Sequence, residues 1–461
     1  MRSESRAPAT AARTAPPRPT VSGSAQPTAA GPARSAACYL GRLMPVLDPD
    51  TQHAPHAPPA PRGPFAGIPR NVVALGFTAL LTDVSSEMLV PILPLFITVT
   101  LGASATSLGL IEGLAEFVAS LLRTTSGWLS DRMGRRKPFV VAGYALSGAA
   151  KAAIGLATGW PAVLALRCSD RLGKGLRTPP RDAIIADSTA AADRGRAFGL
   201  HRAMDTAGAA MGPLLGWWLL ARWSSLGPEA YRRVFFVSAI PAALAVIVLL
   251  LFVRAGRHAP PARRTLTEQA GALGAPFLRF LVVDALFQLG NSSNAFVLLR
   301  TQSAGWSASQ VSLIYVGFNV LLAALAMPFG HLSDRAGRRP LLLAGYAVYA
   351  VTYGVLALGA TRLGVVAGFA LLAVHTALMD GQAKAMIADL VPADMRATAY
   401  GAHATVVGLA LLPASIAAGV LWEHVGHAAP FVLGAALALA AAALFLVLLP
   451  AHTEGAERGA S

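Results

Sequence analysis

The sequence predicts an all-α membrane protein in which twelve transmembrane helices form two bundles of six. The first supporting observation is composition: 54% of the 461 residues are hydrophobic and only 13% are charged, whereas soluble domains carry roughly 25% charged residues. The second is the presence of apolar runs such as 234–253 and 431–449, because about 20 apolar residues suffice to cross a bilayer. The third is an internal repeat.

The repeat consists of two pairs of similar segments. The motif GWLSDRMGRR, which starts at Gly127, returns as GHLSDRAGRR, which starts at Gly330, 203 residues later. The sequence AIIAD at 183–187 returns as AMIAD at 385–389, an offset of 202. Two separate matches at nearly one offset indicate that one half of the chain duplicates the other.

Apolar runs and the repeat together give six spans in each half. The stretch 161–183 carries several charges and would fail a hydropathy test, but it takes the place of the apolar stretch 363–385 and is therefore a span as well. Because six is even, both halves start from the same side, which predicts parallel repeats. The predicted spans are 71–98, 106–129, 139–158, 161–183, 197–221, 234–253, 276–299, 309–330, 341–360, 363–385, 398–421 and 430–449.

Composition and charge give the arrangement outside the spans. Residues 1–68 are rich in Pro, Ala and Arg and lack apolar periodicity, which predicts a disordered tail. Twenty Lys and Arg residues collect at one side of the predicted spans and five at the other, so the positive-inside rule places both termini in the cytoplasm and the protein in the cytoplasmic (inner) membrane. The predicted parts are the cytoplasmic tail 1–68, an N-terminal bundle 69–254, a cytoplasmic linker 255–274, a C-terminal bundle 275–450 and a cytoplasmic tail 451–461.

Several of these motifs resemble a known family. The repeated Gly-x-Leu-Ser-Asp-Arg-x-Gly-Arg-Arg loop resembles the signature loop of the major facilitator superfamily (MFS). The segment GAAMGPLLG at 208–216 is similar to the helix 5 motif of the antiporters in that superfamily, and the tracts 82–88 and 170–182 resemble a poorly characterised bacterial subgroup. The resemblance implies the MFS fold and an antiporter-like transporter.

The resemblance also implies that the two repeated loops gate the cytoplasmic side. An aspartate near the start of a helix is favoured by the helix dipole, and it can pair with arginines of a neighbouring helix when that side closes. A plain topology signal at a solvated loop is the alternative. The candidate gating residues are Gly127, Asp131, Arg132, Gly134 and Arg135 in the first loop, and Gly330, Asp334, Arg335, Gly337 and Arg338 in the second.

The fifth span carries a second motif. Gly208, Gly212 and Gly216 share one helix face and permit close contact with another helix, and Pro213 interrupts the hydrogen-bond ladder. Close packing explains these residues by itself, and the antiporter resemblance adds that the bend limits leak.

Charged residues inside the spans are the candidates for proton and substrate coupling. A charge at mid-membrane costs about 3 kcal/mol on insertion scales, so these side chains should face a wet cavity or one another. Glu112 and Glu116 are four residues apart and share a helix face; we favour them as proton or substrate carboxylates, with Asp83 and Glu87 as partners. The alternative is a static network that holds spans 1, 2 and 4 together. The candidate coupling residues are Asp83, Glu87, Glu112, Glu116, Lys151, Arg167 and Asp170.

Pro179 and Pro180 predict that the fourth helix ends there, since neither has a backbone N–H. Other features of the sequence exclude particular kinds of binding site. The glycines of the same tract lack P-loop spacing, so no ATP site is predicted. The two cysteines, Cys38 and Cys168, provide neither a disulfide framework nor a metal site.

We therefore expect a secondary transporter and not an enzyme, with no cofactor, no metal and a proton gradient as its energy source. The expected partners are the lipid bilayer, a small-molecule substrate and protons, without nucleic acid, and a monomer is sufficient. The favoured activity is proton-coupled export of a small organic or drug-like molecule by antiport. The alternatives are proton symport for uptake of a small metabolite or siderophore, and a non-transporting sensor or scaffold on the same fold.

Overall fold

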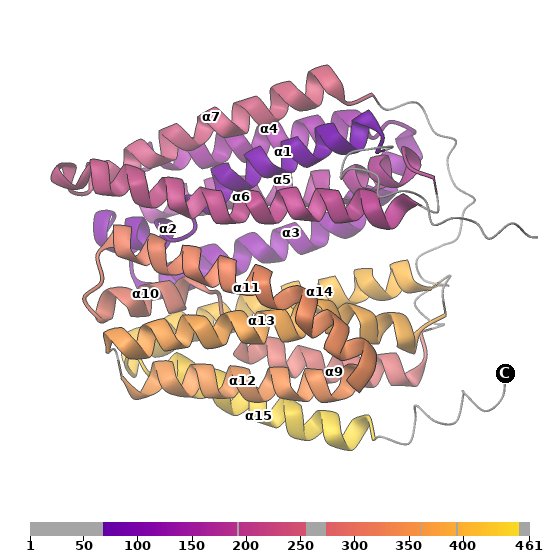
Figure 1. Cartoon of the computed structure of the whole chain (residues 1–461). Helices are drawn as coiled ribbons and strands as arrows, with labels where there is room; N and C mark the ends of the chain where they lie inside the picture. Colours follow the sequence, from indigo (N-terminus) through magenta and orange to yellow (C-terminus); the bar gives the residue numbers. More distant parts are fainter. Residues whose placement is uncertain (1–67, 191–192, 255–272, 360, 393–394, 451–461) are drawn as a thin grey trace, which may run out of the picture. The chain divides into compact units, whose positions relative to one another are not determined.

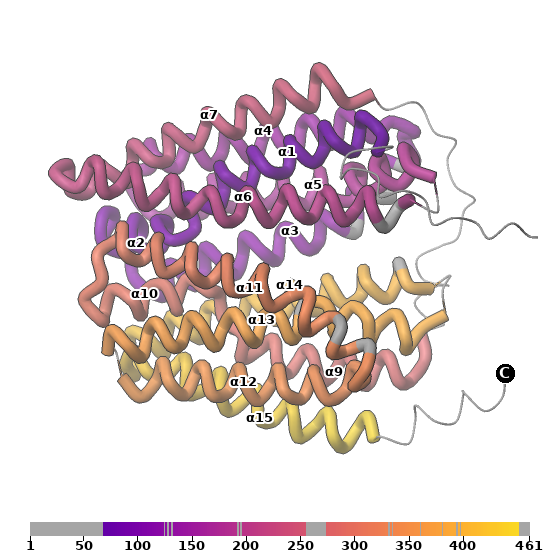
Figure 2. Tube along the Cα trace, in the orientation of Figure 1, coloured from indigo at the N-terminus to yellow at the C-terminus, as the bar shows by residue number. Residues whose placement is uncertain are grey.

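Every regular element in the part of the chain that the structure describes is a helix (Figure 1). The computed structural model describes residues 68–190, 193–254, 273–359, 361–392 and 395–450. These residues confirm the all-α fold with two sets of six segments, and Figure 2 traces the path of the chain through both sets. The predicted tails 1–68 and 451–461 and the linker 255–274 lie outside the described residues, except for residues 68, 273 and 274.

The helices of the N-terminal half are α1 (Arg70–Glu87), α2 (Leu93–Leu95) with a π-helical turn (Phe96–Thr100), α3 (Ala105–Met133), α4 (Lys137–Ile154), α5 (Trp160–Asp187), α6 (Arg194–Arg222) and α7 (Glu229–Phe252). Those of the C-terminal half are α9 (Ala275–Gly290), α10 (Ala295–Ser303), α11 (Ala308–Ala336), α12 (Arg338–Leu358), α13 (Arg362–Leu390), α14 (Arg396–His424) and α15 (Ala429–Leu448). By length and composition, seven of the described helices can cross a membrane. The charged helix α5 is not among them, and only the repeat identifies it as a span.

Segments 1 and 7 are broken, whereas continuous spans were predicted over 71–98 and 276–299. The chain leaves the helical conformation at 88–92 and again at 291–294. The first break contains Pro91, which has no backbone N–H, and the second consists of Asn and Ser residues, whose side chains compete for backbone hydrogen bonds. Since the second break starts 203 residues after the first, the two halves break at equivalent positions.

The predicted end of the fourth helix is wrong, because α5 continues through Pro179 and Pro180 to Asp187. Pro179 has no N–H to donate to the carbonyl of Gly175, four residues earlier. Instead, Ser126 Oγ of α3 donates a hydrogen bond to Gly175 O at 2.9 Å. A side chain from the neighbouring helix therefore replaces a bond that proline cannot make.

The two halves meet along α3 with α14 and along α6 with α11. In the repeat, α3 corresponds to α11 and α6 to α14, so these two contacts are equivalent. The first is a close backbone contact: a Cβ atom added to Gly109 of α3 would lie 2.1 Å from the carbonyl oxygen of Ser415, and one added to Gly419 of α14 would lie 2.6 Å from that of Ala105.

We call the two ends of the helices the basic end and the opposite end. The basic end contains Arg132, Arg136, Arg254 and Arg338, where α3, α7 and α11 finish and α4 and α12 start. At the opposite end, Thr106 Oγ1 of α3 donates a hydrogen bond to the Glu423 carboxylate of α14. The close contact between α3 and α14 begins at this end.

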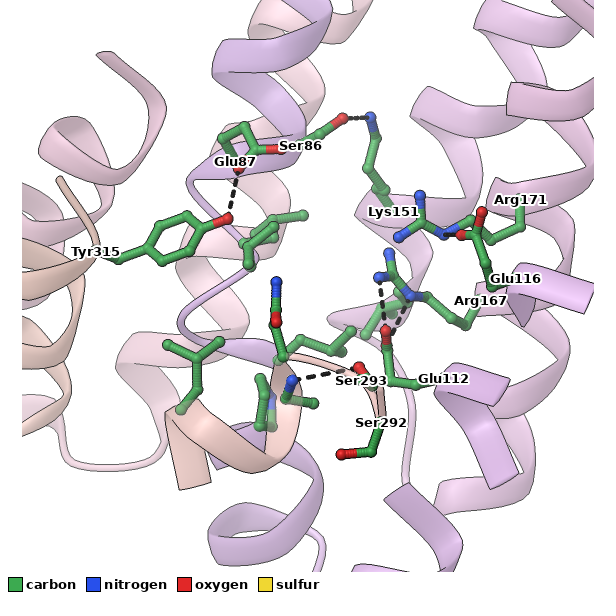
Figure 3. Close-up of a pocket in the computed structure, with 18 of the residues that line it drawn as sticks. Ser86, Glu87, Glu112, Glu116, Lys151, Arg167, Arg171, Ser292, Ser293 and Tyr315 are labelled. Atoms are coloured by element: carbon green, nitrogen blue, oxygen red, sulfur yellow. Dashed lines mark hydrogen bonds and ion pairs between the residues drawn. The ribbon is translucent and has the colours of Figure 1, made fainter. Parts of the chain in front are cut away.

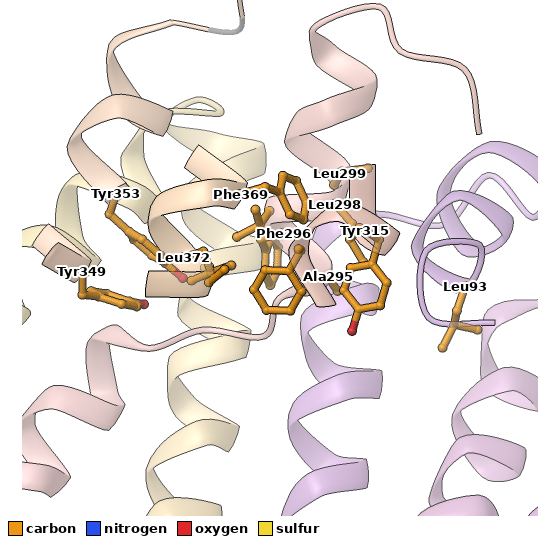
Figure 4. Packing of buried hydrophobic residues seen from close by; sticks show 14 of the residues in the cluster. Leu93, Ala295, Phe296, Leu298, Leu299, Tyr315, Tyr349, Tyr353, Phe369 and Leu372 are labelled. Carbon is orange, nitrogen blue, oxygen red and sulfur yellow. The ribbon is translucent and has the colours of Figure 1, made fainter. Parts of the chain in front are cut away.

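The core of the C-terminal half is rich in aromatic rings (Figure 4). Tyr349 and Tyr353 of α12 are fully buried and stack with their ring centroids 4.0 Å apart. Phe287 of α9 packs edge-on against Tyr349 at 4.9 Å. This packing fixes α9 against α12 directly beside the break in segment 7.

Candidate functional site: a charged cavity between the halves

A cavity of about 320 Å³ lies between the two halves (Figure 3). Both broken segments contribute to its wall, together with residues of α3, α4, α5, α7, α11 and α14. The charged side chains among the described lining residues all come from the N-terminal half: Glu87, Glu112, Glu116, Lys151, Arg167 and Arg171. Five of the seven predicted coupling residues therefore line one cavity.

Arg167 of α5 is the centre of a buried ion-pair network. Its Nε donates to Glu112 Oε1 at 3.0 Å and its Nη2 to Glu112 Oε2 at 3.3 Å. Its Nη1 donates to Asp170 Oδ2 at 3.1 Å, and Ser147 Oγ donates to Asp170 Oδ1 at 2.6 Å. Asp170 is buried behind the cavity wall. Bidentate pairing fixes the guanidinium plane, so this network holds α3 against α5.

Glu116 is paired as well. Arg123 Nη2, two turns further along α3, donates to Glu116 Oε1 at 2.8 Å, and Arg171 Nε of α5 lies 3.8 Å from Glu116 Oε2. Arg123 and Glu116 are seven residues apart, and this helical spacing brings their side chains to one face of α3. Both favoured carboxylates, Glu112 and Glu116, thus face arginines.

Lys151 and Glu87 differ from the other lining charges. Lys151 Nζ of α4 donates to Ser86 Oγ of α1 at 2.6 Å, and Tyr315 Oη of α11 donates to Glu87 Oε2 at 3.3 Å. Each charged group is thus bonded to a neutral hydroxyl. Ser86 and Tyr315 were not among the sequence candidates, because an isolated hydroxyl in an apolar span gives no signal of its role.

Asp83 lies away from the cavity wall, although it is one turn from Glu87. It faces α6, where its Cβ would lie 2.9 Å from a Cβ atom added to Gly208. Its carboxyl group faces the carboxyl group of Asp205 on α6, which also accepts a hydrogen bond from Arg202 Nη1 at 3.2 Å. Asp205 was missed by the sequence reasoning, although an acid within the apolar span 197–221 was a usable signal.

The opposing wall, from the C-terminal half, is polar but uncharged. It consists of Asn291, Ser292, Ser293 and Asn294 at the break in segment 7, together with Tyr315 and apolar residues. Ser293 N donates to Ser415 Oγ of α14 at 3.3 Å. The Asn and Ser side chains at the break in segment 7 therefore provide amide and hydroxyl groups to the cavity wall.

Both repeated loops contain a glycine with a positive φ angle. Gly134 and Gly337 have φ angles of 61° and 87°, a region that favours glycine. Gly127 and Gly330 lie within α3 and α11. Among the arginines, Arg132, Arg135 and Arg335 are exposed, whereas the side chains of Asp131 and Asp334 lie outside the described part of the chain.

Each loop is joined to the second repeated segment of its own half. In the N-terminal half Arg136 pairs with Asp187. In the C-terminal half Arg338 Nε lies 3.5 Å from Asp389 Oδ2, and its Nη1 donates to Ser333 Oγ at 2.7 Å. The two segments that reveal the duplication are thus in contact in both halves.

The glycine face of α6 packs against α1. A Cβ atom added to Gly208 would lie 2.5 Å from Leu80 O, and one added to Gly216 would lie 2.9 Å from Met88 O. Gly212 meets α1 between these positions, and Pro213 lies inside a continuous α6. The predicted close helix approach is present, and its partner is the helix that carries Asp83 and Glu87.

A second titratable pair lies in the C-terminal half. His403 Nε2 of α14 lies 3.0 Å from Asp284 Oδ2 of α9, and Asp284 is 1% exposed. His403 therefore has an acidic partner on another helix. Among the described residues, no group of three or more His, Cys, Asp or Glu side chains is placed to hold a metal ion.

The comparison with known families decides the identity of the fold. A sequence model of the Major Facilitator Superfamily matches residues 75–287 and residues 277–461, that is, both halves in turn. The chain belongs to the Major Facilitator Superfamily. This MFS protein is therefore a multi-pass membrane transporter of the MFS type.

Relatives of this MFS protein include proteins without an assigned substrate. It is 36% identical over 387 residues to the uncharacterized MFS-type transporter MJ1317 of Methanocaldococcus jannaschii, a match that covers 82% of this chain and 95% of the relative. It is 37% identical over 145 residues to the multidrug resistance protein MdtH of Photorhabdus laumondii, which covers 31% of this chain and 36% of MdtH. The structure of the nucleoside transporter NupG (D323A mutant) is similar with a TM-score of 0.68 and 15% identity, covering 82% of this chain and 99% of NupG.

Proposed function

We propose that this MFS protein exports a small polar organic molecule in exchange for protons by alternating access. The observation that carries the proposal is the cavity itself, which lies between the halves and has charged groups on one wall and neutral hydrogen-bonding groups on the other. Its volume of about 320 Å³ is near the lower end of the roughly 300–1,000 Å³ of small-molecule sites. A small polar solute fits this cavity better than a large lipophilic one.

Alternating access requires that the halves separate at one end while they meet at the other. Here the contacts of Gly109 and Thr106 with α14 join the halves at the opposite end. We assign the basic end to the cytoplasm, with both termini on that side and the protein in the cytoplasmic (inner) membrane, because lysine and arginine favour the cytoplasmic side. The repeated loops at that end are the proposed cytoplasmic gate.

The proposed proton carrier is the pair of Asp83 and Asp205. Two carboxyl groups that face each other repel when both are ionised, so the pair favours holding one proton between them. Glu112 and Glu116, which the sequence favoured, are already ion-paired with arginines. Asp83 and Asp205 lie at the α1–α6 contact, and Asp83 is one helical turn from Glu87 on the cavity wall. We infer that protonation of this pair changes the position of α1 and therefore the shape of the cavity.

The direction of transport is proposed from two resemblances. The glycine-proline motif of α6 is similar to that of MFS antiporters, and part of the chain is similar to MdtH, named as a multidrug resistance protein. The energy source is the proton gradient, without a cofactor, and one chain containing both halves is sufficient for function. Proton symport for uptake remains the second transport hypothesis.

Proton flux into reconstituted liposomes tests this function. The purified chain is reconstituted with a pH-sensitive dye inside, and each compound of a library of small organic solutes is added with and without an imposed pH gradient. Compound-dependent proton movement that Asp83→Asn and Asp205→Asn abolish supports the proposal. His403→Gln is the matched control, because it removes the other titratable pair and should leave proton movement intact. A deletion strain that becomes sensitive to the compound indicates export.

The same experiment can reject the proposal. Substrate flux that is indifferent to the pH gradient excludes proton coupling. Absence of flux for the whole library, with protein inserted and monodisperse, favours a non-transporting sensor or scaffold. Loss of proton movement in His403→Gln alone would move the proton carrier to the C-terminal half.

A further inference from the structure

The six charged side chains on the cavity wall are not equivalent. Glu112 is bonded to Arg167 at 3.0 Å, and Glu116 lies 3.8 Å from Arg171 and 2.8 Å from Arg123. A charged ligand can displace these partners only by leaving another buried charge without compensation, which is costly. The paired groups therefore form the wall of the site without offering a free charge to a ligand.

Lys151 and Glu87 are the two charged residues of the cavity wall that are not in ion pairs among the described residues. Among the described residues, neither side chain has an oppositely charged atom within the 4.0 Å limit of an ion pair. An ammonium group has three donors and a carboxylate has about four acceptor positions, yet the side-chain bonds present are one from Lys151 to Ser86 and one from Tyr315 to Glu87. Most of the hydrogen-bonding capacity of both groups is thus available to a ligand.

More distant charges do not neutralise this pair. Asp170 and Asp83 attract Lys151 from beyond ion-pair distance, but Asp170 is already bonded to Arg167. Arg171 and Lys174 of α5 act on Glu87 in the same way. None of these more distant groups takes up a direct contact position on Lys151 or Glu87, so those contacts stay open to a ligand.

The two groups also lie close together along the cavity wall. Lys151 Nζ is bonded to Ser86, and Ser86 and Glu87 are consecutive residues of α1 (Figure 3). A ligand that reaches both needs a negative group and a positive group separated by a short linker. A ligand with a single charge would leave either the ammonium or the carboxylate buried and unpaired.

We propose that the substrate is a small zwitterion whose anionic group binds Lys151 and whose cationic group binds Glu87, with Asn291 and Asn294 contacting its uncharged part. The inference rests on the proposed transport function and adds the substrate class. It also links binding to movement. Tyr315 of the C-terminal half donates a hydrogen bond to Glu87 of the N-terminal half. A cationic group that binds Glu87 would replace this bond and remove one contact between the halves.

A binding assay with compounds of known charge separation tests the inference. The probes are glycine, β-alanine, 4-aminobutanoate, 5-aminopentanoate and 6-aminohexanoate, and their effect on the thermal unfolding of the purified full chain in detergent gives the affinity. Pentanoate and pentylamine match 5-aminopentanoate in length but carry one charge each. We expect at least one zwitterion to bind at least about tenfold more tightly than the single-charge compounds of its length, because losing one buried charge contact costs that much or more.

Variants assign each charge to its residue. In Glu87→Gln the zwitterion should bind no better than the acid, and in Lys151→Met no better than the amine. Tyr315→Phe should tighten zwitterion binding, because it removes the competitor for Glu87. Gly317→Ala, at a helical glycine with nothing within 4 Å of an added Cβ, is the control and should behave as the unaltered chain.

Three results would overturn the inference. They are equal binding of zwitterions and single-charge compounds, binding preferences unchanged in Glu87→Gln and Lys151→Met, and no binding of any zwitterion to the folded, monodisperse chain. The assay uses no gradient, so a wrong proposal for proton coupling or direction leaves its result unaffected.

Discussion

Replacing Gly109 by alanine should open the contact between α3 and α14. The added Cβ would lie 2.1 Å from the carbonyl oxygen of Ser415. Because the clash is with backbone, a rotamer change cannot relieve it, and the two helices must separate. Overpacking of this kind costs about 1–3 kcal/mol, which lowers the ratio of the conformation closed at the opposite end to the open one by roughly 5- to 150-fold.

Cross-linking measures this population. Thr106 and Glu423 are hydrogen-bonded across the same contact, so cysteines at both positions report whether the opposite end is closed. The background chain carries Cys38→Ser and Cys168→Ser, and a short bifunctional thiol reagent gives the rate of cross-linking. We expect Gly109→Ala to slow this rate, by up to the factor by which the closed-to-open ratio falls.

Gly317→Ala provides the control, because nothing lies within 4 Å of an added Cβ there. An unchanged cross-linking rate in Gly109→Ala, with the protein folded, would refute the reasoning from the backbone contact. An equal slowing in Gly317→Ala would show that any added methyl group has this effect.

Three further predictions follow from packing and charge. Arg167→Met should destabilise the protein by about 3–5 kcal/mol, seen as a lower unfolding temperature, because it leaves Glu112 and Asp170 without their arginine; an unchanged temperature would contradict this. Glu116→Gln should leave compound-dependent proton movement in liposomes intact, and its loss would return Glu116 to the proton path. Gly434→Leu should lower stability by about 1–3 kcal/mol, because an added Cβ would lie 2.7 Å from a backbone oxygen of α9; thermal unfolding that matches the unaltered chain would count against it.

The twelve-segment architecture could be predicted because apolar length and internal duplication are both visible in the sequence. Apolar length identifies most spans, and the duplicated motif identifies α5, whose charges hide it from a hydropathy test. The glycine turns at Gly134 and Gly337 could be expected as well, since both motifs place glycine where the chain turns between helices.

The breaks in segments 1 and 7 were missed because they interrupt otherwise apolar runs, and the end of α5 was predicted incorrectly because it depends on a tertiary partner. Pro179 is tolerated inside α5 because Ser126 of a different helix bonds the carbonyl that the proline leaves free. The sequence of α5 alone therefore does not predict that the helix continues through its two prolines.

The candidate site was predicted in part. Helical spacing places Glu112 and Glu116 on one face, but it does not say which helix that face meets, so their arginine partners on α5 could not be assigned. The pairing of Asp83 with Asp205 was missed for the same reason. Periodicity gives the direction of a side chain relative to its own helix, and only packing gives its neighbour.

Access to the cavity from both sides of the membrane tests the account most directly. Asn294→Cys, in the background without other cysteines, places one thiol on the cavity wall. In right-side-out and inside-out vesicles, a membrane-impermeant thiol reagent should modify it from both faces, and Gly109→Ala should raise the share of labelling from the face of the opposite end. Labelling from one face only, in the same ratio with and without Gly109→Ala, would contradict a cavity that opens alternately to the two sides.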